Sequence, residues 1–190
     1  MKYVILAVLG LWGAIASGAD LAVRTPFEQL FVAIEKENLN AIHDLLEQHN
    51  DLIDQIQNSD RRPFYRYSAL HLAAEKGYLP AVKKLVAKIK ERWLQSRLIN
   101  RLASQQTPLD LAIAHGHLDV ATYLVQTGGA ECREEHLAQA VRLKNLDVTR
   151  WLVNRLHSEG TLAALDAASQ SQTSPEILFF LGQRLKRKYL

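Results

Sequence analysis

The sequence predicts an all-α fold made of stacked pairs of short helices, and two observations support this class. First, residues 68–87 read as one helix–turn–helix unit, in which Ser68 is a helix N-cap, Gly77 ends the first helix and Pro80 suits the start of the second. Second, the same pattern begins again at Thr107, 39 positions after Ser68. Because a helix pair cannot bury both of its faces alone, such units are stable only when they stack.

Residues 1–19 precede the predicted fold. An apolar run, residues 4–16, follows Lys2, and small residues at 17–19 fit the cleavage site of a signal peptidase. Thirteen apolar residues are fewer than the ~20 that a membrane-spanning helix needs. We therefore expect a signal peptide that is cut after Ala19 and a periplasmic or secreted mature chain without stable membrane insertion. An uncleaved anchor is the alternative.

The remaining chain, residues 20–190, is predicted to form one domain of four to five repeats. Their approximate bounds are 27–60, 61–103, 104–133, 134–160 and a degenerate 161–183. Glu37 stands in the first repeat where the two central repeats have Gly, so the end of that helix is an open question. Gly128 and Gly129 predict a helix C-cap and turn.

The second repeat has the most unusual composition. It opens with residues 61–67, which hold three arginines and three aromatic side chains. These side chains suit a binding surface, because Arg and Tyr dominate interaction hot spots. The alternative is that Phe64 and Tyr67 pack beneath the loop while the arginines are solvated. The second helix of this repeat is predicted to continue to Ile99, with its cationic side facing water.

Two segments carry a family resemblance. Residues 70–74 (Leu-His-Leu-Ala-Ala), residues 107–109 (Thr-Pro-Leu) and the pair Gly116–His117 match parts of a T-P-L-H-x-A and G-H pattern. The chain thus resembles ankyrin repeats, with Asp110 in place of the family's His and Tyr78 in place of the His after Gly. The resemblance implies a solenoid with short fingers that binds another protein through its concave face.

Carried over position by position, the resemblance also implies which residues face the partner. Ala103 is expected among the finger positions, and Lys36 and Leu143 beside the turns that join the paired helices. The predicted protein-binding residues are Phe64, Tyr65, Tyr67, Glu75, Lys76, Ser104, Gln106, His115 and Arg142.

Catalytic and metal-binding patterns are not apparent in the sequence. His115 and His117 leave a tetrahedral metal site half filled, and His117 falls on the family's structural histidine. Cys132 with His136 is a second weak pair, beside acidic residues that suit a helix start. We therefore expect no enzyme, no cofactor and no metal.

Net charge and cysteine content limit the kinds of partner and of covalent link that this chain can have. The formal net charge is +3, and it falls to +2 when Lys2 is removed with the signal peptide, which is too little for nucleic-acid binding by default. Cys132 is the only cysteine, so an internal disulfide is excluded.

These features predict a monomeric periplasmic adaptor that binds another protein. Two narrower roles remain open, an immunity protein that inhibits a toxin delivered to the periplasm and a helper of a stress-defence oxidoreductase.

Overall fold

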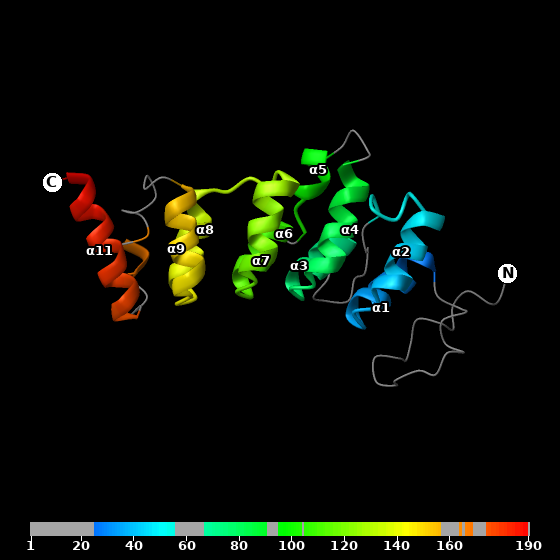
Figure 1. Cartoon of the computed structure of the whole chain (residues 1–190), viewed down its shortest axis with the longest axis horizontal. Coiled ribbons are helices and arrows are strands. Elements are labelled where there is room, and N and C mark those ends of the chain that lie inside the picture. The colour runs from blue at the N-terminus through cyan, green and yellow to red at the C-terminus, as the bar shows by residue number, and fades with distance from the viewer. Residues whose placement is uncertain are drawn as a thin grey trace.

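The structure is a computed structural model that describes residues 25–55, 67–90, 95–103, 105–156, 164, 166–168 and 174–189. In this part of the chain, antiparallel helix pairs follow one another in a single row from α1 to α11 (Figure 1). The pairs are α1 (Pro26–Glu35) with α2 (Leu39–Gln48), α3 (Ala69–Glu75) with α4 (Leu79–Lys90), α6 (Pro108–Ala114) with α7 (Leu118–Tyr123), and α8 (Glu134–Arg142) with α9 (Leu146–Arg155). The other elements are α5 (Gln95–Ile99), the π-helical turn η2 (Leu124–Gly128) and α11 (Pro175–Tyr189).

The pairs stack in two layers. The first helices form one layer, in which α3 packs between α1 and α6 and α6 also contacts α8. The second helices form the other, in which α4 lies between α2 and α7, and α11 packs on α9 at the far end. The predicted all-α solenoid is therefore confirmed. None of the helices in the described part is both long and apolar enough to cross a membrane.

Small residues let the first helices approach one another. In four repeats an alanine stands at the same position of the first helix, four residues before the residue of positive φ that follows that helix. These alanines are Ala33, Ala73, Ala112 and Ala140, and all are buried. A larger side chain there would force the layer apart, because repeat-to-repeat packing leaves no room for it.

Each of these first helices begins with the same bond at its N-cap, and in α1 and α6 the N-cap threonine hydroxyl accepts a bond in return. The side chain of the third helical residue turns back and accepts a hydrogen bond from the backbone N–H of the N-cap residue. The helix itself offers this N–H no partner. The bonds are Thr25 N to Glu28 Oε2 at 2.9 Å, Ser68 N to His71 Nδ1 at 3.3 Å, Thr107 N to Asp110 Oδ2 at 2.7 Å and Arg133 N to His136 Nδ1 at 2.9 Å. Asp110 thus does the work of the family's histidine.

The long second helix predicted for repeat two is wrong. The structure has two helices, α4 ending at Lys90 and α5 beginning at Gln95. Because α5 packs back against α4 and η2, it buries Leu98 and Ile99, which an unbroken helix would carry away from the stack.

The glycine turn follows the prediction more closely. Gly129 is the C-cap of η2 with a left-handed φ of 79°, as its place after that turn predicts. Ala164, Ala167 and Ala168 are helical and buried ahead of α11, which itself buries Ile177. The predicted signal peptide and residues 20–24 lie outside the described residues.

Candidate functional site

Four helix-ending turns share one backbone geometry. In each, a residue with positive φ follows the first helix, and the next residue donates its N–H to the carbonyl of the buried alanine five positions earlier. The φ values are 54° at Glu37, 70° at Gly77, 77° at Gly116 and 57° at Lys144. The alanine bonds are 2.9 Å for Asn38, 3.0 Å for Tyr78, 2.8 Å for His117 and 3.1 Å for Asn145. Glu37 therefore ends its helix as glycine does in the central repeats.

In two of the four turns, the residue that follows the turn ties it to the repeat before. His117 Nε2 lies 2.9 Å from the Glu75 carbonyl oxygen, and the Tyr78 hydroxyl donates to the Glu37 carbonyl at 2.8 Å. Tyr78 thus replaces the family's histidine in function, and His117 has the structural role that the sequence predicts. These bonds fix the spacing between successive turns.

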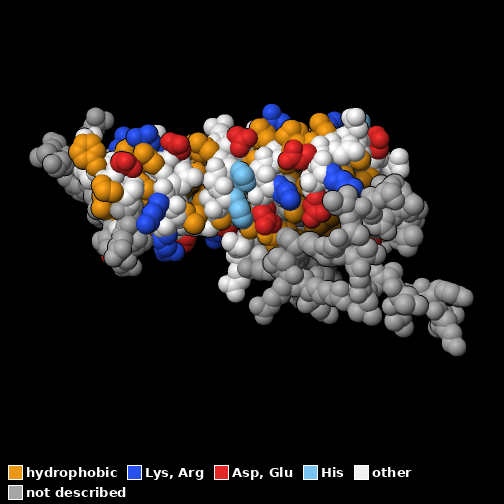
Figure 2. Space-filling view, turned by 90° about the horizontal axis from the view of Figure 1, so that it is seen from below, with side chains coloured by type: hydrophobic (Ala, Val, Ile, Leu, Met, Phe, Trp, Pro, Cys, Tyr) orange, Lys and Arg blue, Asp and Glu red, His pale blue; other side chains and the backbone are white. Residues whose placement is uncertain are grey.

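The turns together present a surface that we call the turn face, residues 35–38, 75–78, 114–117 and 142–145. One equivalent position is exposed in all four turns, and its side chain varies along the row. The residues at this position are Lys36, Lys76, His115 and Leu143. In Figure 1 the turns lie at the lower ends of the helices, and Figure 2 views the molecule from below, with histidine side chains near the middle and acidic and basic groups on both sides.

The predicted residues Lys76, His115 and Arg142 lie exposed on the turn face. His115 is held by a 3.0 Å contact between its Nδ1 and the Leu111 carbonyl, and its ring stacks on that of His117 with centroids 6.2 Å apart. This leaves Nε2 as the ring nitrogen that is available to a partner.

The prediction that Tyr67 faces a partner is wrong, and the packed alternative applies to it. Its side chain is only 6% exposed, and its ring centroid lies 5.4 Å from that of His71. Burial, and then the charge and hydrogen bond of the Glu75 carboxylate, raise the pKa of Tyr67 well above its usual value. Glu75 is half-buried, and its Oε2 is enclosed without a hydrogen-bond partner. Part of the predicted site is therefore scaffold.

The finger between repeats two and three also differs from the prediction. Ala103 and Gln106 pair through their backbones at 2.8 and 2.9 Å, and this closes the finger while burying Ala103. Gln106 is half-buried, whereas Leu102 is 54% exposed. Leu102 was missed, although an apolar residue next to a finger is a signal that could have been read. Phe64, Tyr65 and Ser104 lie outside the described residues.

Leu143 is a second exposed apolar residue, at 48%, and the cations Arg142 and Lys144 flank it. The family resemblance pairs Leu143 with Arg142 beside the turn, although only Arg142 is among the predicted protein-binding residues. Its exposed methyl groups stand out only once the turn geometry is known.

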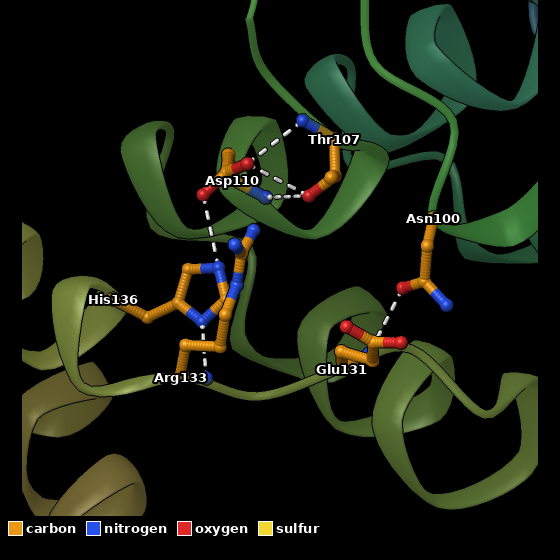
Figure 3. Close-up of polar contacts among 6 residues, drawn as sticks. All are labelled: Asn100, Thr107, Asp110, Glu131, Arg133 and His136. Atoms are coloured by element: carbon orange, nitrogen blue, oxygen red, sulfur yellow. Dashed lines mark hydrogen bonds and ion pairs between the residues drawn. The ribbon is translucent and has the colours of Figure 1, made fainter.

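The polar groups that pair between helices and loops are structural. Figure 3 shows Asp110 between Thr107 and His136, with His136 Nε2 at 2.9 Å from Asp110 Oδ1, and it shows Asn100 Oδ1 accepting from the Glu131 N–H at 2.9 Å. Burial opposes ionisation of Asp110, but the bonds from His136 and Thr107 outweigh it and bring its pKa to about 2. Among the described residues, no group of three or more His, Cys, Asp or Glu side chains could hold a metal.

His71 and Cys132 are equally unsuited to acid–base or thiolate chemistry. Burial lowers the pKa of His71 to about 4, and its Nε2 lies 3.0 Å from the Arg101 carbonyl, so the neutral ring links α3 to the chain just ahead of the finger. Burial also raises the pKa of the Cys132 thiol, which makes it a poorer nucleophile.

Comparison with known proteins agrees with this geometry. Residues 30–136 match the family model described as ankyrin repeats (3 copies), and the family is in general a non-catalytic module for protein–protein interaction. A search of curated proteins finds no match. Since the model spans more than half of the chain, the protein belongs to the ankyrin-repeat family.

Proposed function

We propose that this protein is a monomeric periplasmic adaptor that binds another protein through its turn face. The observation that carries the proposal is the row Lys36, Lys76, His115 and Leu143. Beneath these side chains the backbone is the same in the four described turns, while the side chains themselves are basic, basic, imidazole and apolar. A rigid frame with a variable row is suited to recognition, because little conformational freedom is lost on binding.

The chemistry of the turn face also changes along the stack. Its first two turns mix acids with lysines at Glu35, Lys36 and Glu75, whereas its fourth turn holds Arg142 and Lys144 around an apolar side chain. A partner therefore meets a mixed end and a cationic end. This asymmetry favours one orientation of the bound protein over the reverse.

Site-specific photo-crosslinking in cells tests the proposal. A photoreactive residue at His115 or Arg142 should give a crosslinked adduct, whereas one at His43 or Lys84, exposed on the second-helix layer, should not. Adducts of equal yield from both layers would contradict the turn face as the binding surface.

The same experiment separates the narrower roles by the identity of the adduct. A secreted toxin would identify an immunity protein, and a periplasmic oxidoreductase would identify a helper in stress defence. The intact mass of the purified protein tests the location, because a chain that begins at Asp20 has lost the predicted signal peptide. An unprocessed chain in the cytosol would contradict the periplasmic assignment.

A further inference from the structure

The end of the stack at the first repeat carries a shallow groove of about 270 Å³ between α1 and α2. Val32, Ala33, Ala41 and Leu45 give it an apolar floor, and Lys36 is among its polar rim residues. In the repeats that follow, the preceding first helix covers this side, as α1 covers α3, α3 covers α6 and α6 covers α8. The first repeat has no repeat before it in the described chain.

We propose that residues 20–24 of the same chain fill this groove and close the end of the stack. The segment lies outside the described residues and directly precedes Thr25, the N-cap of α1. Thr25 has φ −59° and ψ 152°, which is not a helical conformation, so the chain before it does not continue along the axis of α1. In an extended segment Leu21 and Val23 point to one side and Ala22 to the other.

The length of the segment matches the groove. Counted from Thr25, an extended chain places Val23 at about 7 Å, Leu21 at about 13 Å and Asp20 at about 16 Å. Along α1, at about 1.5 Å per residue, Gln29 lies at about 6 Å, Ala33 at about 12 Å and Lys36 at about 16 Å.

A segment that runs back beside α1 therefore brings its two larger apolar side chains over the groove. Val23 comes level with Gln29, and Leu21 comes level with Ala33. Asp20 comes level with Lys36, which is exposed and of opposite charge. The apolar pattern, the length and the charge of residues 20–24 thus all fit the groove.

This role goes beyond partner binding, because it concerns how the solenoid ends. A terminal repeat needs a cover on its outer side, since its apolar surface otherwise meets water. Here the cover is a five-residue strap and not another helix pair.

Hydrogen–deuterium exchange tests the strap in protein produced from the full-length gene, with intact mass showing that all variants begin at the same residue. The double variant Leu21→Asp/Val23→Asp should speed exchange about tenfold in peptides from α1 and α2. Peptides from α8 and α9, at a distance along the row, should be unchanged. The control Ala22→Asp adds a charge to the same segment on the side turned away from the groove, so it should exchange like the wild type.

Any of three results would overturn the proposal. The first is equal exchange from α1 and α2 in all three proteins, and the second is equal acceleration by the control and the double variant. The third is protection of α1 and α2 that rises with protein concentration, because a second copy and not the strap would then cover the groove.

Discussion

The imidazole of His117 lies against the α-carbon of Gly77, so that a β-carbon on residue 77 would sit 2.4 Å from Nδ1 of His117. The same ring reaches the Glu75 carbonyl through Nε2. This contact joins the second and third repeats at their turns. Gly77 is thus required twice, for its φ of 70° and for the space that His117 fills.

We expect Gly77→Ala to lower the free energy of unfolding by at least about 2 kcal/mol, since the left-handed backbone alone costs an alanine roughly 1–2 kcal/mol. Urea unfolding measures the effect. Gly182→Ala is the matched control, because nothing lies within 4 Å of a β-carbon there and alanine favours the interior of α11. If Gly77→Ala cost the same in the wild type as in a His117→Ala background, the ring contact would not matter.

Lys144→Gly should stabilise the protein by roughly 0.5–1 kcal/mol. Lys144 has a φ of 57°, which glycine adopts without strain, although glycine also loses more freedom on folding. The melting temperature and urea midpoint should both rise. A decrease in both would mean that the lysine side chain contributes more to the fold than its exposure suggests.

Asp110→Asn should destabilise the protein by about 2 kcal/mol at neutral pH, because an amide cannot accept from both Thr107 and His136. The pKa of Asp110 is about 2 when folded and near 4 when unfolded. Its contribution is therefore complete above pH 4 and is lost as the pH falls towards 2. The difference in unfolding free energy between wild type and variant should shrink over that range, whereas the exposed control Asp147→Asn should show a small difference throughout.

His71 should make the fold sensitive to a milder acid range. Its pKa is about 4 when folded and about 6.5 when unfolded, so the unfolded chain takes up a proton first as the pH falls. The group thus costs up to about 3 kcal/mol of stability between pH 6.5 and pH 4. His71→Gln should flatten the stability profile in that window, and His43→Gln on the surface of α2 should not. Parallel profiles for wild type and His71→Gln would contradict the burial of a neutral ring.

The stack itself was predictable, because the signals are local. Cap residues such as Ser68 and Thr107 and the turn residue Gly77 mark helix ends whatever lies around them. The break between α4 and α5 was not predictable in this way. Helical periodicity continues across it, and the break arises because α5 packs on α4 and η2.

The site was predictable only in part. Lys76 and His115 follow from their place beside a turn, which sequence alone gives. Tyr67 and Ala103 look equally available in the sequence, yet Tyr67 packs on His71 and Ala103 lies inside the finger. Burial of an aromatic or small residue depends on how the folded chain packs around it, and this is known only from the fold.

The affinity of the turn face for the protein captured by crosslinking is the most direct measurement of the central claim. Lys76→Ala/His115→Ala/Arg142→Ala should weaken binding by at least about 2 kcal/mol, or roughly thirtyfold, if these residues are hot spots. The matched variant His43→Ala/Lys84→Ala/Lys90→Ala removes one imidazole and two cations from the other layer and should bind as the wild type does. Unchanged binding by the first variant, with its fold intact, would contradict the assignment of the turn face.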